Sequence, residues 1–310
     1  MQWKLERIDP NPLTSDGPFE SRLRSTGSTF QRFRLRVKSA FDRMVTAHSD
    51  QFDRDLESAP VEIIAHRGAS HAAPENTIAA ARLAWVERAD ALEVDVHLTR
   101  DGRLAVIHDS DTLRTAGVRR IVAESTWAEL AGLDVGSWKD PVYRGEKIPD
   151  LPAILWEVPA GKRLFIELKG PPNTVPEVQR CVLSAVDGPA PVLQISQVVL
   201  MAFDFETARA AKAALPACEV CWLAESGAAA PRSSLQEIAD AARAAGLDGI
   251  DVDAGWTMDA RLVKQIRGDA FKLYAWTVDD APLARKLAAA GLDGIATNRP
   301  ARLRAELGWA

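Results

Sequence analysis

One stretch of this 310-residue chain gathers the side chains best suited to chemistry. His66 and Arg67 stand at its start, Glu93 and Asp95 in its middle and His108 near its end. Because a strand points alternate side chains to one face, the two carboxylates project together and repel each other unless a cation lies between them. Hard oxygen ligands of this kind suit Mg²⁺ or Ca²⁺. The set therefore indicates metal-assisted phosphoester chemistry.

Longer motifs surround these residues in a fixed order. They are HRGASHAAPENT from residue 66, LEVDVHLTRDGRLAVIHD from 92, LDVGSW from 133, IPDL from 148, FIELK from 165, WTV from 276 and DGIATNRP from 293. The ordered set resembles the glycerophosphodiester phosphodiesterase family over residues 61 to 305. The resemblance implies an α/β barrel that hydrolyses glycerophosphodiesters to sn-glycerol 3-phosphate and an alcohol such as choline or ethanolamine.

Phosphodiester chemistry and this resemblance together predict the catalytic groups. We expect His66 and His108 to act as general base and general acid on opposite sides of phosphorus, since imidazole titrates near neutral pH. Which histidine has which role stays open, as does direct attack by water against a cyclic phosphate formed by the glycerol 2-hydroxyl. The divalent cation, Mg²⁺ or Ca²⁺, would offset charge as a Lewis acid. Its expected ligands are Glu93, Asp95 and Glu167.

Further residues are expected around this centre. Arg67 and Lys169 would bind the phosphoryl oxygens, and Arg suits two oxygens at once. Trp276 would form a wall of the substrate pocket. Glu75, from the Pro-Glu-Asn-Thr motif, is expected beside the metal or holding Arg67. His97 continues the strand parity of the two carboxylates, so we expect it just behind the residues that touch metal and substrate.

Two asparagines belong to the same motifs. Asn76 is expected to cap the helix that starts at Thr77. Asn298 stands where the family usually has Asp, so this position departs from the family pattern.

Strand-like segments alternate with alanine-rich helical segments from residue 61 onward, which predicts a parallel sheet. The predicted strands are 61–66, 90–97, 104–108, 163–168, 197–203, 218–224, 248–253, 271–277 and 294–297, and the predicted helices include 77–88, 205–214, 233–245, 258–267 and 280–290. Asp101 and Gly102 are typical of a hairpin turn, so 104–108 is a return arm and eight strands remain. We therefore predict a (β/α)₈ TIM barrel, whose active site lies at the carboxyl ends of the strands.

Residues 110 to 162 form a long insertion after the second strand and its hairpin. Loops of this length in a compact domain are usually functional. The family resemblance implies that an insertion at this position covers the active site, so we expect it to supply the wall against the organic group of the substrate. The predicted domains are an N-terminal extension, residues 1–58, and the phosphodiesterase barrel, residues 59–310.

Residues 21 to 46 carry seven basic residues and one acidic residue. Phe30, Phe33, Val37, Phe41 and Met44 recur at helical spacing, which predicts a cationic amphipathic helix with an aromatic stripe. Since the whole chain has a net charge of −5, the remainder is acidic. We therefore favour packing of this helix on its own barrel or on a second subunit, with contact to an anionic membrane as the alternative.

Charge and composition restrict the other functions. A net charge of −5 argues against general nucleic-acid binding. The chain has no apolar run of about 18 residues and no apolar core of a secretory signal, so we expect a cytoplasmic protein, with the membrane periphery as an alternative. Cys218 and Cys221 form a C-x-x-C without a second pair, and we interpret them as buried strand residues.

Two other functions compete with the leading prediction. One is lysophospholipase D activity on lysophospholipids at a membrane surface, with the cationic helix at the lipid. The other is a non-catalytic phosphate-binding barrel, which would require the loss of a histidine or an acid, and none is missing. The sequence thus favours a hydrolase of lipid and glycerol metabolism.

Overall fold

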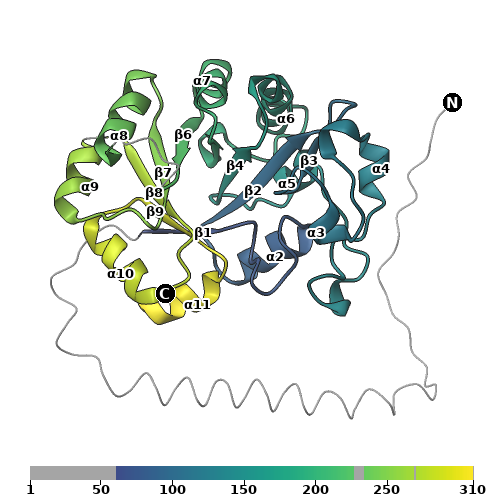
Figure 1. Cartoon of the computed structure of the whole chain (residues 1–310), viewed down its shortest axis with the longest axis horizontal. Helices are drawn as coiled ribbons and strands as arrows, with labels where there is room; N and C mark the ends of the chain where they lie inside the picture. Colours follow the sequence, from purple (N-terminus) through teal and green to yellow (C-terminus); the bar gives the residue numbers. More distant parts are fainter. Residues whose placement is uncertain (1–60, 227–233, 269, 310) are drawn as a thin grey trace, which may run out of the picture. The chain divides into compact units, whose positions relative to one another are not determined.

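The computed structural model describes residues 61–226, 234–268 and 270–309 (Figure 1). The predicted helix at 21–46 and the predicted domain boundary at 58 and 59 lie outside these residues.

Nine strands form one sheet in the described part of the chain, and eight of them close a parallel barrel (Figure 1). The strands are β1 (Glu62–Ala65), β2 (Ala91–Leu98), β3 (Leu104–Val106), β4 (Arg163–Leu168), β5 (Val198–Ala202), β6 (Glu219–Ala224), β7 (Gly249–Asp253), β8 (Lys272–Trp276) and β9 (Gly294–Thr297). Pairing runs from β1 through β2 and β4 to β9, which pairs back with β1. β3 lies antiparallel on β2. The prediction of an eight-stranded barrel with a hairpin on its second strand is confirmed.

Helices follow the strands and lie on the outside of the barrel (Figure 1). They are α2 (Ile78–Val86), α3 (Leu113–Ala116), α4 (Trp127–Ala131), α5 (Leu151–Trp156), α6 (Val175–Asp187), α7 (Phe205–Ala214), α8 (Leu235–Ala244), α9 (Ala260–Arg267), α10 (Ala281–Ala290) and α11 (Pro300–Leu307). Six of them begin at a polar side chain that accepts a hydrogen bond from the backbone N–H three residues later, which satisfies a free donor of the first turn. These caps are Thr77, Asp150, Asp204, Ser234, Asp259 and Asp280.

The barrel interior changes from apolar to polar along the strands. Ile64, Phe165 and Tyr274 are almost fully buried in a small interior cluster. Side chains two positions further along a strand point to the same face, nearer the carboxyl end. Those positions hold His66, Glu167 and Trp276.

A polar group closes the opposite, amino-terminal end of the barrel. Arg163 donates hydrogen bonds to Glu62 at 2.9 Å, to Glu219 at 2.7 Å and to the hydroxyl of Tyr274 at 3.1 Å. Because these partners come from different strands, Arg163 ties the amino ends of the strands together.

The insertion at 110–162 has a small core of its own. Val122, Leu130, Val135 and Ile148 are buried together with Ile107, which follows β3. The insertion therefore packs on the hairpin side of the barrel. Within the described residues, no helix is both long and apolar enough to span a bilayer.

Candidate active site

Three carboxylates meet at the carboxyl ends of β2 and β4. Asp95 and Glu167 are paired in register, and Glu93 lies two residues before Asp95 on the same face. One oxygen from each carboxylate lies within 4.8 Å of the others. The three residues are 4%, 1% and 8% exposed for Glu93, Asp95 and Glu167, respectively. Three buried oxygens at this spacing match the ligands of a hard divalent cation.

The electrostatics of the carboxylates fit the same conclusion. Burial, followed by the charges of Asp95 and Glu167, raises the pKa of Glu93 well above its usual value. Burial and then Asp95 raise the pKa of Glu167 to about 7. Burial also acts to raise the pKa of Asp95, but Lys169 and Arg67 outweigh it and lower that pKa. A bound cation would let all three carry charge.

Two protein cations lie against these carboxylates. Nζ of Lys169 is 3.1 Å from Oδ1 of Asp95 and 2.6 Å from Oε1 of Glu167. Apart from Lys169, both of these buried oxygens are without a partner. They are therefore available to a second cation, as the ligands of a metal site must be.

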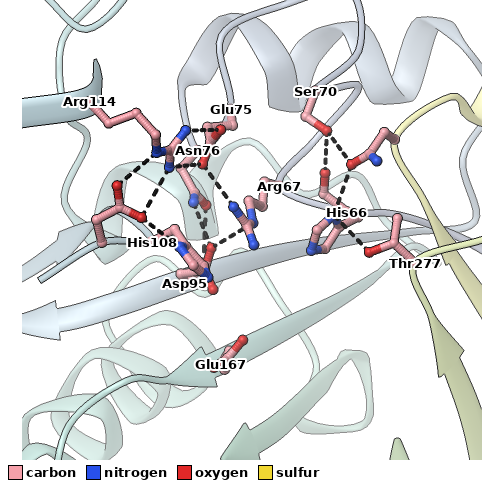
Figure 2. A network of polar contacts seen from close by, with 12 residues as sticks. His66, Arg67, Ser70, Glu75, Asn76, Asp95, His108, Arg114, Glu167 and Thr277 are labelled. Atoms are coloured by element: carbon pink, nitrogen blue, oxygen red, sulfur yellow. Dashed lines mark hydrogen bonds and ion pairs between the residues drawn. The ribbon is translucent and has the colours of Figure 1, made fainter. Parts of the chain in front are cut away.

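Arg67 joins the carboxylates to the loop that follows β1 (Figure 2). Its backbone N–H donates to Oε2 of Glu93 at 2.8 Å. Its guanidinium lies 3.2 Å from Asp95 and donates to Glu75 at 3.0 Å. Of the two placements expected for Glu75, the structure shows contact with Arg67.

His66 follows β1 and is held through one ring nitrogen. Its Nδ1 lies 2.8 Å from Oδ1 of Asn298. Ser70 donates to the same oxygen at 2.8 Å and to the backbone carbonyl of His66 at 2.7 Å. The amide nitrogen of Asn298 donates to Asp279 at 2.8 Å. Burial and then the charge of Arg67 lower the pKa of His66 to about 4.

His108 is held in the same manner by a different partner. Its Nδ1 lies 2.8 Å from Oδ1 of Asp109. The hydrogen bond from Arg114 is the largest influence on Asp109, whose pKa falls to about 2. His97 contacts His108 from behind, with Nε2 3.0 Å from the backbone oxygen of His108.

The expectation that Asn76 caps the following helix is wrong. Thr77 is the cap, since its hydroxyl accepts from the N–H of Ala80 at 3.2 Å. Asn76 instead has φ of 57° and donates to Oδ2 of Asp95 at 2.7 Å. Its side-chain oxygen accepts from the N–H of Asp95 at 3.2 Å. The left-handed backbone, which Asn tolerates, turns this amide away from the helix and toward the carboxylates.

A cavity of about 440 Å³, which includes open solvent at its mouth, lies between the two histidines and the carboxylates. Trp276 lines it and packs edge-to-face on Phe203, with ring centroids 5.7 Å apart. Among the described lining residues, none comes from the insertion at 110–162. The apolar lining of this cavity comes from barrel strands and from Phe203, so the expectation that the insertion supplies the wall against the organic group of the substrate stays a prediction. The remaining lining residues are His66, Arg67, Glu93, His108, Glu167, Lys169, Met201, Leu223, Glu225, Asp251 and Ala296.

The sequence reasoning missed several polar residues of the site. Asp109 directly follows His108 in the sequence, and this adjacency could have indicated that its carboxylate contacts the imidazole. Arg114 and Asp279 give no such signal, because their contacts depend on loop conformation. Asp251 lines the cavity with one oxygen unpartnered, and burial raises its pKa well above the usual value.

An eight-stranded α/β barrel with acids, bases and cations converging on the carboxyl ends of its strands is the architecture of a barrel enzyme. Comparison with known proteins identifies the family of this barrel enzyme. The chain belongs to the glycerophosphoryl diester phosphodiesterase family, whose model matches residues 66–302. The earlier resemblance is thus confirmed, and the chain is a phosphoric diester hydrolase.

Relatives cover nearly the whole barrel. The YhdW protein of Bacillus subtilis is 34% identical over 241 residues, which are 77% of this chain and 94% of YhdW. A glycerophosphodiester phosphodiesterase of Caldanaerobacter subterraneus is 31% identical over 78% of this chain and 95% of its own. Among solved structures, an Oleispira antarctica phosphodiesterase in complex with the product sn-glycerol-3-phosphate has a TM-score of 0.67 and 28% identity, covering 80% of this chain and 96% of that one.

Proposed function

We propose that this enzyme hydrolyses glycerophosphodiesters to sn-glycerol 3-phosphate and an alcohol, with a divalent cation and two catalytic histidines. The observation that carries the proposal is the meeting of Glu93, Asp95 and Glu167 within 4.8 Å. Glu93 and Glu167 line a cavity that His66 and His108 also line, and Asp95 lies buried behind it. The product bound to the Oleispira phosphodiesterase supports the same reaction.

The three carboxylates are the proposed metal ligands. Mg²⁺ or Ca²⁺ held there would supply Lewis acidity to the phosphoryl oxygens. Arg67 and Lys169 are the proposed ligands of the remaining phosphoryl oxygens, because both line the cavity beside the carboxylates. Trp276 is the proposed wall against the substrate.

The reaction needs one proton acceptor and one proton donor. In the direct route the oxygen of water adds to phosphorus and the bond from phosphorus to the alcohol oxygen breaks. In the cyclic route the glycerol 2-hydroxyl displaces the alcohol oxygen first, and water then adds to phosphorus as the bond to the 2-oxygen breaks. One histidine takes the proton of the attacking hydroxyl, and the other gives a proton to the departing oxygen. In both rings Nδ1 is already engaged, so Nε2 is the atom left for proton transfer.

The partners of Nδ1 favour one assignment of the two roles. His66 pairs with a neutral amide, and burial lowers its pKa to about 4. A neutral imidazole at pH 7 can accept a proton, so His66 is the proposed base. His108 pairs instead with the carboxylate of Asp109. We assign it the remaining role, that of the acid.

Phosphorus NMR of the products tests this function directly. The substrate panel would hold glycerophosphodiesters and lysophospholipids, each with Mg²⁺ and with Ca²⁺. We expect sn-glycerol 3-phosphate from the glycerophosphodiesters. Turnover of lysophospholipids alone would replace this proposal by lysophospholipase D activity, and no turnover of either class would leave a phosphate-binding barrel.

For the extension, we propose that residues 21–46 dock on this protein's own barrel or on a second subunit. The basic charge of the segment and the acidic charge of the remainder support this. Deleting residues 1–50 should then lower the melting temperature or dissociate an oligomer. Lost sedimentation with anionic vesicles, with both properties unchanged, would instead favour the membrane surface. The cytoplasm remains the proposed location.

A further inference from the structure

Arg114 lies on the short helix α3 of the insertion, and its guanidinium donates hydrogen bonds to the carboxylates of Glu75 and Asp109 (Figure 2). Nη1 and Nη2 donate to the two oxygens of Glu75 at 2.7 and 2.8 Å. Nε donates to Oδ2 of Asp109 at 2.7 Å, and Nη2 also reaches Oδ1 at 3.2 Å. One guanidinium therefore makes four hydrogen bonds to two carboxylates.

Each of these acids supports a different residue of the site. Glu75 accepts a hydrogen bond from Arg67 at 3.0 Å, on the loop after β1. Asp109 holds Nδ1 of His108 at 2.8 Å, on the loop after β3. Arg114 thus joins the supports of a proposed phosphate ligand and of a proposed proton donor, which belong to separate loops.

We propose that Arg114 is a positioning residue that fixes Arg67 and His108 relative to each other through Glu75 and Asp109. The inference rests on the proposed function. Without the guanidinium the two acids repel each other, and Asp109 is free to turn its carboxylate away from the imidazole. Lysine offers a point charge on a flexible stem, so it cannot reproduce the planar fork. The insertion then acts on the reaction through this side chain, although it does not line the cavity.

Arg119 of the same insertion provides a matched control. Its Nε donates to Asp111 at 2.8 Å, and Asp111 otherwise accepts from the backbone N–H of Leu113 at 3.0 Å rather than from a side chain of the site. The test compares Arg114→Ala, Arg114→Lys and Arg119→Ala for turnover of a glycerophosphodiester, below the melting temperature of each. We expect a loss of about tenfold or more in kcat for Arg114→Ala, since small misplacement of reacting groups is costly. Arg114→Lys should recover part of it, and Arg119→Ala should stay within about twofold of wild type.

The leaving group separates positioning from general loss of structure. An aryl phosphodiester needs little protonation of its departing oxygen, so Arg114→Ala should lose less kcat on it than on a glycerophosphodiester. Arg114→Ala combined with Asp109→Asn should lose less than the product of the two single losses, because both variants remove the same support of His108. Arg114→Lys covers the case in which Arg114→Ala does not fold.

Failure of the positioning role and failure of the proposed function give different results. Equal losses on both substrates, multiplicative losses in the double variant, or retention of more than half of kcat by Arg114→Ala would each overturn the positioning role alone. An inactive wild-type enzyme on every substrate would overturn the proposed function and the inference with it.

Discussion

Nδ1 of His66 lies 2.8 Å from the amide oxygen of Asn298. The amide nitrogen of Asn298 donates to Asp279 at 2.8 Å, so the oxygen must face the imidazole. An oxygen can only accept, and the network therefore assigns the proton of a neutral His66 to Nδ1. His108 has a carboxylate in the same place. The two rings differ in the charge of their partners.

The variant Asn298→Asp should shift the acidic limb of the pH–rate profile to higher pH. A carboxylate beside Nδ1 favours the imidazolium and raises the pKa of His66, which is about 4 in the wild type. Because the proposed base works only when neutral, activity would fall at a higher pH, by about one unit or more. The measurement is kcat/KM against pH, with Ser70→Ala as the control that keeps the amide. An unmoved acidic limb would contradict the role of His66 as base.

The histidine variants should differ in how the leaving group affects them. His66→Ala and His108→Ala should each lower kcat on a glycerophosphodiester by about 10²-fold or more, the usual scale of acid–base catalysis. An aryl phosphodiester should partly rescue His108→Ala only. Rescue of His66→Ala instead would reverse the two assignments, and normal rates for both variants would remove the histidines from the reaction.

Removal of metal should abolish activity and lower stability. Exhaustive chelation should stop turnover, and Mg²⁺ or Ca²⁺ should restore it. A cation that binds only the folded state, present at one hundred times its Kd, adds about 2.7 kcal/mol. Melting with and without metal measures this. Glu167→Gln should lose most of the metal-induced shift, whereas Glu206→Gln, on the exposed face of α7, should keep it. Full activity after chelation is the result that rejects the metal.

The buried carboxylates also predict how the metal-free protein responds to pH. Burial and Asp95 raise the pKa of Glu167 from 4.5 to about 7. Between these values the folded state binds more protons than the unfolded state, so this group makes stability fall as pH rises. Glu167→Gln removes the effect, and its stability relative to wild type should increase from pH 4.5 to pH 7 in chelator. Thermal unfolding of both proteins across this range is the measurement, and a constant difference would show that Glu167 is not perturbed.

Much of the fold could be predicted because strand periodicity decides it. The segment predicted at 163–168 is β4, Arg163–Leu168, and its parity places Glu167 inside. The same parity places Glu93 and Asp95 together. Helices α6 and α11 were not among the predicted helices, but the prediction of the barrel rested on the strands and did not need them.

The contacts that support the site were harder to predict, since they join distant loops. Arg114 lies 39 residues from Glu75 in the sequence, and Asn298 lies 232 residues from His66. The conformation of Asn76 has φ of 57°, and no spacing rule indicates it. Periodicity fixes which face a strand residue occupies, but it does not fix the path of a loop.

The buried layer of Ile64, Phe165 and Tyr274, with Arg163 on its amino-terminal side, closes the catalytic cavity at one end. Substrate cannot pass through the barrel, so substrate and product use the same opening at the carboxyl ends of the strands. A phosphate product that is still bound would then block binding of the next substrate. A single opening therefore predicts that the proposed product, sn-glycerol 3-phosphate, inhibits competitively, so that it raises the apparent KM and leaves kcat unchanged.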